Sequence, residues 1–140
     1  MITTAQRYHD ISCGHRVVGH EGKCRFLHGH NYRVHFYCKA AGGLDNIGRV
    51  IDFSVIKARL CMWLEDRWDH RMLLWEDDPH CCELQSIDSS VVVLPFNPTA
   101  ENLAAYLLNT VGPAQLDGTG VDLVRVDIEE TRKCAVTTSL

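Results

Sequence analysis

This sequence of 140 residues lacks several features that would identify a membrane protein or a disulfide-bonded protein directly. Its longest apolar runs, such as Val91 to Leu94, are far too short to cross a bilayer, and it carries no lipidation signal. Its seven cysteines are an odd number without any C-x-x-C pair, and no apolar leader stands at its start. We therefore expect a protein of the reducing cytoplasm that needs neither a membrane nor disulfide bonds.

An excess of positive charge is missing as well. The formal net charge is -4, which argues against nucleic acid as the main partner, because duplex binding depends on a basic surface. Repeats and low-complexity tracts are absent, and 46% of the residues are hydrophobic, enough to bury a core. We expect a single domain over residues 1–140.

The pattern of apolar residues predicts an α+β fold with an antiparallel sheet and two helices packed on one face. The first helix is expected to begin at a cap on Asp52 or Ser54 and to run to about Trp68. The second is expected to begin at Thr99 and to be ended by the segments Gly112-Pro113 and Gly118-Thr119-Gly120. The polar stretch 76–90 is expected to be a loop. The predicted strands cover residues 6–12, 31–41, 49–53, 91–95, 121–130 and 134–138.

Three histidines near the start of the chain are typical of a metal site. His28 and His30 stand two residues apart, so on a strand their side chains point to the same face, and His15 precedes them closely. Three imidazoles without a fourth protein ligand are typical of catalytic zinc, which keeps one coordination position open. Zinc suits nitrogen ligands best, although copper, nickel and iron are also compatible with them.

Cys24 lies four residues before His28, between Lys23 and Arg25. Nearby positive charge favours a thiolate, which makes this cysteine a candidate base or nucleophile. The alternatives are a fourth zinc ligand or a buried, inert thiol.

Two acidic motifs farther along are ambiguous on their own. The carboxylate of Asp69 can orient the adjacent His70 for proton transfer, or the pair can simply cap a helix end. On a strand, only one of Glu129 and Glu130 can face inward, where a carboxylate can accept two hydrogen bonds from the amidine-like edge of a heterocycle such as a pterin or guanine. The four remaining histidines are expected to be structural or exposed; they are His9, His20, His35 and His80.

Taken together and in this order, the motifs resemble the 6-pyruvoyltetrahydropterin synthase superfamily over nearly the whole chain. They are Cys24-x-x-x-His28-Gly29-His30, the small residues before His15, Val50-Ile51-Asp52-Phe53, Asp69-His70, Pro98-Thr99-Ala100-Glu101-Asn102-Leu103 and Glu130-Thr131. The three-residue gap after the cysteine resembles the 6-carboxytetrahydropterin synthase branch, which serves queuosine biosynthesis; the pyruvoyl-forming branch usually has five residues there.

The resemblance implies a tunnelling fold, in which subunits join their sheets into a barrel, commonly as a hexamer of two trimers with pockets between subunits. It implies that His15, His28 and His30 bind zinc, that Cys24 accepts a proton, and that Asp69 and His70 relay protons. Glu130 would anchor the pterin and, as a further catalytic residue, share in the proton relay, and the pterin site would be lined by Thr99, Ala100 and Glu101.

The implied reaction converts 7,8-dihydroneopterin triphosphate into 6-carboxy-5,6,7,8-tetrahydropterin, acetaldehyde and triphosphate. Two alternatives remain open: the pyruvoyl-forming reaction, which eliminates triphosphate, and a non-catalytic zinc-binding assembly protein. The sequence departs from the family at Cys13-Gly14, where Ala-Ala is usual, and at Leu74, where asparagine is frequent. These departures concern the shape of the pocket rather than the metal ligands.

Overall fold

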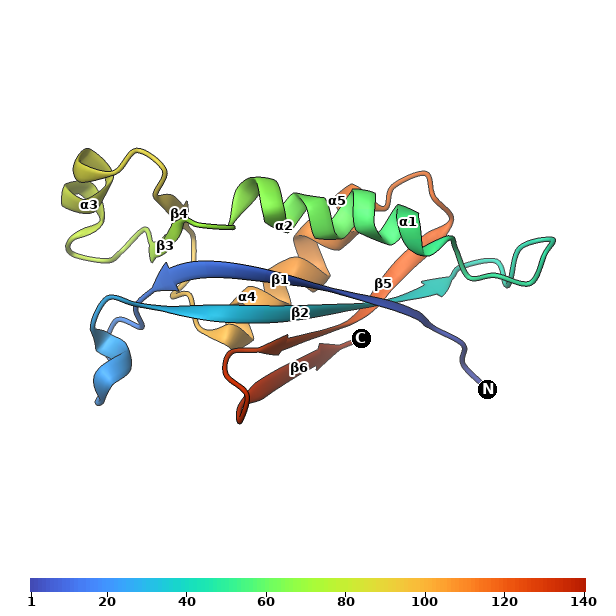
Figure 1. Cartoon of the computed structure of the whole chain (residues 1–140), viewed down its shortest axis with the longest axis horizontal. Helices are drawn as coiled ribbons and strands as arrows, with labels where there is room; N and C mark the ends of the chain where they lie inside the picture. Colours follow the sequence, from blue (N-terminus) through green and yellow to red (C-terminus); the bar gives the residue numbers. More distant parts are fainter.

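A computed structural model describes all residues from 1 to 140. Its centre is a six-stranded sheet with the strand order β4-β3-β1-β2-β5-β6. The strands are β1 (Ala5–His15), β2 (His28–Ala40), β3 (Met72–Trp75), β4 (Val92–Leu94), β5 (Val121–Glu129) and β6 (Ala135–Ser139). The sheet is curled, and Figure 1 shows the helices gathered on one side of it.

The four longest strands pair antiparallel, as predicted from the sequence. β1 and β2 form an unbroken ladder from Ala5 opposite Cys38 to His15 opposite His28. On this ladder the side chains alternate between a buried face toward the helices and a more open face. The short β3 and β4 extend the β1 edge in parallel orientation, and β3 was not expected.

Two long helical segments cover the sheet, close to the predicted positions. The first comprises α1 (Phe53–Ile56), the π-helical η2 (Lys57–Cys61) and α2 (Met62–Arg67). The second comprises α4 (Ala100–Tyr106), the π-helical η3 (Leu107–Val111) and α5 (Gly112–Gln115). Asp52 caps the first by accepting from Ser54 N, and Thr99 caps the second by accepting from Asn102 N. Both predicted caps are confirmed.

Three predictions about elements were wrong. Residues 49–53 do not form a strand, because the Asp45 carboxylate accepts from the backbone N–H groups of Ile47 and Arg49 and holds this stretch in a turn. The predicted loop 76–90 contains the helix α3 (Cys81–Ile87). The second helix does not end at Gly112-Pro113, because Pro113 falls in the first turn of α5, where its missing N–H is tolerated. It ends at Gln115, before the other expected end segment, Gly118-Thr119-Gly120.

The hydrophobic core lies between the buried face of the sheet and the two helical segments. Gly112 allows a close approach there, since a Cβ atom at this position would lie 2.5 Å from Leu123 Cδ2 on β5. The metal-ligand candidates lie at one end of this core, where β1 ends and β2 begins. None of the helices has both the length and the apolar character required to cross a membrane.

Candidate metal centre and its surroundings

The side chains of His15, His28 and His30 converge at the end of the β1–β2 ladder. His15 stands directly opposite His28, and His30 is opposite Cys13, so all three side chains lie on the face toward the helices. Their nearest ligand atoms all lie within 4.8 Å of one another. His15 is 1% exposed, which places one ligand in the core itself.

The rings of His15 and His28 use Nδ1 for hydrogen bonds to the backbone, so that Nε2 faces the cluster. His15 Nδ1 lies 2.6 Å from the Pro98 carbonyl oxygen, and His28 Nδ1 lies 2.7 Å from that of Phe26. Each Nδ1–H therefore donates to a carbonyl, and each Nε2 carries the lone pair that binds a metal. The buried Nε2 atoms of His28 and His30 have no hydrogen-bond partner within the protein.

These unpaired atoms show that the site fits a metal ion. A buried nitrogen without a partner is costly, and a metal in the cluster would satisfy it. Burial also lowers the pKa of His15 to about 4, and burial lowers the pKa of His30, so that both rings favour the neutral, metal-binding form at neutral pH. Three nitrogen ligands suit zinc and leave a position open.

Two further side chains contact this cluster. The hydroxyl of Tyr32, which is 2% exposed, lies 3.1 Å from His15 Nε2. Glu130 Oε1 lies 3.5 Å from His15 Nε2 and 3.6 Å from His30 Nε2. Tyr32 was missed by the sequence reasoning, although the alternation of a strand places it on the same face as His30.

The alternation predicted for the acidic pair is confirmed. Glu130 turns toward the histidine cluster, whereas Glu129 turns to the other face of the sheet, where it hydrogen-bonds His35. Only Glu130 is therefore placed to anchor a ligand beside the metal site.

Cys24 lies in the short 3-10 helix η1 (Lys23–Arg25), within the connection between β1 and β2. The residue is partly buried. Burial raises the pKa of the Tyr32 phenol, and negative charge at neighbouring groups adds to this; those groups are Cys13, Glu130 and Cys24. Cys24 therefore lies in the connection that joins His15 to His28, and its contact with the cluster of histidines stays a prediction.

Asp69 and His70 form a pair of their own just after α2. His70 Nδ1 lies 2.7 Å from Asp69 Oδ2, and Asp69 Oδ1 accepts from Ser12 N at 2.9 Å. Partial burial favours the protonated acid, but the hydrogen bonds from Ser12 and His70 outweigh it and lower the pKa of Asp69. The His70 side chain is 80% exposed and its φ is 59°, an unusual conformation for a non-glycine residue.

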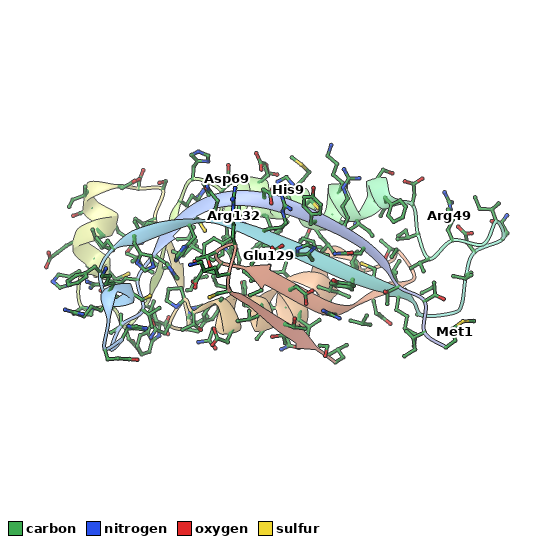
Figure 2. The ribbon with its side chains drawn as sticks, turned by 60° about the horizontal axis from the view of Figure 1, so that its bottom comes forward. Met1, His9, Arg49, Asp69, Glu129 and Arg132 are labelled. Carbon is green, nitrogen blue, oxygen red and sulfur yellow. The ribbon has the colours of Figure 1, made fainter.

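A hollow of about 970 Å³ lies beside this pair, and its lining includes His30, Asp69, His70, Glu130 and Arg132. Figure 2 shows Asp69, Glu129 and Arg132 in this part of the molecule, with Met1 and Arg49 at the opposite end. Arg132 adds a positive charge to this hollow, whose lining also includes carboxylates. Such a hollow offers the polar groups that a heterocycle with a charged side chain requires.

The residues predicted to line a pterin site lie at the start of α4. Thr99 caps the helix, Ala100 is buried in the core and Glu101 is exposed on the first turn. They adjoin the metal centre through Pro98, whose carbonyl holds His15. Their contact with a ligand stays a prediction.

The other histidines have local hydrogen bonds, as expected of structural or exposed residues. His9 bonds Glu65, His20 accepts from Gly22 N, His35 bonds Glu129, and His80 bonds Arg16.

The two departures from the family pattern are both buried: Leu74 lies in β3, and burial raises the pKa of Cys13 to about 12. Cys13 is therefore a protonated core residue and not a second reactive thiol.

Comparison with protein families gives a match to the model of 6-pyruvoyl tetrahydropterin synthase over residues 4–139. Among curated proteins, the 6-carboxy-5,6,7,8-tetrahydropterin synthase of Rickettsia felis is 35% identical over 140 residues, covering 97% of this chain and 99% of that protein. The probable 6-carboxy-5,6,7,8-tetrahydropterin synthase of Halobacterium salinarum is 37% identical over 123 residues, with coverages of 86% and 76%.

Solved structures share the fold. An uncharacterized protein of Wolinella succinogenes superposes with a TM-score of 0.85 at 23% identity, covering 99% of this chain and 98% of that one. The 6-pyruvoyl tetrahydropterin synthase of Caenorhabditis elegans gives a TM-score of 0.70 at 24% identity, with coverages of 100% and 96%. At these identities the likeness concerns the fold alone.

Proposed function

Because this chain belongs to the 6-pyruvoyl tetrahydropterin synthase family, we propose that it is a zinc-dependent carbon-carbon lyase. Its substrates would be 7,8-dihydroneopterin triphosphate and one water molecule, and its products 6-carboxy-5,6,7,8-tetrahydropterin, acetaldehyde and triphosphate. One observation carries the proposal: the three imidazoles and the Glu130 carboxylate meet at one end of the β1–β2 ladder, and Cys24 lies in the connection between these two strands. The names of the curated relatives favour the carboxy-pterin product.

Each residue has a role that its position supports. Zinc, held by His15, His28 and His30, would supply a Lewis acid for the oxygens of the substrate side chain. Glu130 accepts two hydrogen bonds from the amidine-like edge of the pterin and so fixes the ring. Cys24, as a thiolate, removes a proton from carbon.

His70 moves protons among the side-chain oxygens, and Asp69 holds its ring through the 2.7 Å hydrogen bond to Nδ1. Thr99, Ala100 and Glu101 complete the pterin site from the start of α4. The exposure of His70 supports a site shared between subunits, in which this pair serves the metal centre of a neighbour. We therefore propose a homo-oligomer, with a hexamer of two trimers as the expected form.

The same proposal places the protein in the cytoplasm, at an early step of queuosine or related 7-deazaguanine synthesis. Neither nucleic acid nor a membrane takes part in this step. The substrate is a small molecule whose triphosphate needs local positive charge, which the hollow offers at Arg132.

The decisive experiment is product analysis. The zinc-loaded protein is incubated with 7,8-dihydroneopterin triphosphate under reducing conditions, with and without a chelator, and the products are identified by mass spectrometry. We expect acetaldehyde and the carboxy-pterin, both lost with the chelator. A pyruvoyl-pterin product would assign the other reaction of the family, and no product at all would refute the lyase.

Two cysteine variants separate catalysis from simple zinc binding. Cys24→Ala is expected to abolish turnover while zinc content and oligomer size stay unchanged, and Cys82→Ala, at an exposed position, serves as the matched control. Loss of zinc in Cys24→Ala would instead make Cys24 a ligand.

A further inference from the structure

Asn97 holds the connection between β1 and β2 through two hydrogen bonds of its side chain. Asn97 Oδ1 accepts from Val18 N at 3.0 Å, and Asn97 Nδ2 donates to the Val18 carbonyl oxygen at 2.9 Å. Both bonds are partly buried and together occupy the whole backbone amide pair of Val18. A paired contact of this kind restrains position and orientation at once.

The backbone of Asn97 is itself fixed. Its carbonyl oxygen accepts from Thr99 N at 2.8 Å and from Asn102 Nδ2 at 2.9 Å, which ties it to the capped start of α4. The next residue, Pro98, accepts the Nδ1–H of His15 at 2.6 Å. Two consecutive residues therefore hold the metal ligand His15 and the connection that follows it.

The connection, residues 16–27, is here named the thiol loop because it carries Cys24. Within it, Val17 N donates to the Cys24 carbonyl oxygen at 2.8 Å, so the residue next to Val18 fixes the backbone of Cys24. The loop's other bonds to distant elements come from Arg16, which pairs with Asp78 and His80. Arg16 adjoins β1, whereas Val18 is the anchor nearer to the thiol.

We propose that Asn97 is a positioning residue, which sets the Cys24 thiol at its working distance from the metal centre by clamping Val18 beside the carbonyl that orients His15. The inference rests on the function proposed above for Cys24. Asn97 is neither a metal ligand nor an acid-base group. Its role would be to fix the position of Cys24 relative to the metal centre.

The expected effect concerns turnover more than binding. Misplacing a catalytic group by about 1 Å can reduce the rate about 100-fold. We expect Asn97→Ala to lower kcat about 10-fold to 100-fold while KM changes less than about threefold, because Asn97 touches the loop and not the substrate. Asn97→Asp keeps an acceptor for Val18 N but loses the donor to the Val18 carbonyl, so its kcat should lie nearer to that of Asn97→Ala than to the wild type.

The experiment compares wild type, Asn97→Ala and Asn97→Asp with Asn109→Ala. Asn109 is exposed in the second helical segment and serves as the control. Hydrogen exchange of the peptide covering residues 17–24 and the alkylation rate of Cys24 report on the loop in the metal-free protein. Alkylation of the exposed Cys82 provides an internal reference, and alkylation of the buried Cys38 reports global unfolding. Zinc content, kcat and KM are measured on the loaded protein.

Faster exchange of the thiol loop and faster Cys24 alkylation, with Cys82 and Cys38 unchanged and kcat reduced, would support the proposal. Two results would overturn it: loop exchange equal to wild type in both variants, or a released loop with unchanged kcat. Faster alkylation of Cys38 would also overturn it, since Asn97 would then serve overall stability. A wild type without turnover would refute the lyase function, while exchange and alkylation would still decide whether the clamp exists.

Discussion

The Tyr32 hydroxyl hydrogen-bonds the His15 nitrogen that zinc would need as a ligand. Because it bonds His15 Nε2 at 3.1 Å, metal binding must break this hydrogen bond. We expect Tyr32→Phe to bind zinc about fivefold more tightly, since a net hydrogen bond contributes about 1 kcal/mol. Competition with a chromogenic chelator measures the change.

The control for this prediction is Tyr106→Phe, in the second helical segment away from the ligands, where zinc affinity should stay as in wild type. Weaker zinc binding in Tyr32→Phe would show that the hydroxyl supports the loaded site instead of competing with the metal.

The ion pair of Arg16 and Asp78 gives a pH-dependent prediction. The hydrogen bond from Arg16 is the main cause that lowers the pKa of Asp78, whose side chain is fully buried. Since the folded pKa lies below the ordinary value of 3.8, the stabilisation is complete above that value and is lost as the pH falls through the folded pKa.

Asp78→Asn should therefore lower the free energy of unfolding at pH 7 by about 2 kcal/mol, the typical loss for a bond to a charged group. The difference from wild type should shrink as the pH falls below about 3.8, as measured by urea denaturation. Asp117→Asn, at an exposed position, is the control. A difference that does not depend on pH would contradict the role of the ion pair.

At the scale of residues, the sequence predicted side chains whose spacing alone encodes proximity. His28 and His30 share a face because they are two apart on a strand, and Glu130 differs from Glu129 for the same reason. Asn97 could not be found this way, because its partner Val18 is brought to it only by the fold.

At the scale of elements, the contact between the second helical segment and β5 depends on Gly112. Alanine is the better helix former by about 1 kcal/mol, but its Cβ would lie 2.5 Å from Leu123 Cδ2 and 2.9 Å from Leu123 Cβ. Overpacking of this kind costs about 1–3 kcal/mol, so Gly112→Ala should be destabilising. Urea denaturation tests this.

Gly42→Ala is the matched control, because nothing lies within 4 Å of a Cβ at Gly42 and its φ is not positive. Its stability should be close to that of wild type. A Gly112→Ala variant as stable as Gly42→Ala would show that Leu123 can move aside at no cost.

Elements with a regular spacing of apolar residues or a capping residue at their start were predicted correctly from the sequence. Short elements that form only through contacts with distant parts of the chain were not. The long strands and both helix starts carry local signals. β3 has four residues and exists because it pairs with the end of β1 and with β4. The stretch from Arg49 looked like a strand, but the Asp45 side chain competes successfully for its backbone.

At the scale of the whole molecule, the position of His70 predicts sites built from two chains. Cys24→Ala and His70→Ala subunits, each inactive alone, are co-expressed with different tags and the mixed assemblies are purified. If Cys24 and His70 of one site come from different subunits, random mixing restores about one quarter of the sites. If both come from one chain, no activity returns.

Zinc content of the mixed assemblies is the control, since both variants leave His15, His28 and His30 intact.

The tunnelling fold was predicted from the sequence through its motifs, whereas the placement of a subunit against its neighbours depends on surfaces that no local pattern encodes.

The unbroken ladder of β1 and β2 has a consequence for how this protein can change over evolution. Its register places His15 against His28, and the loop that joins these ends adds only the Phe26 carbonyl that orients the His28 ring. Insertions, deletions or a different acid-base residue earlier in that loop should therefore leave the three histidines in register. The proposed metal ligands and the proposed base thus lie in separate parts of the chain, so that one can change in evolution while the other is conserved.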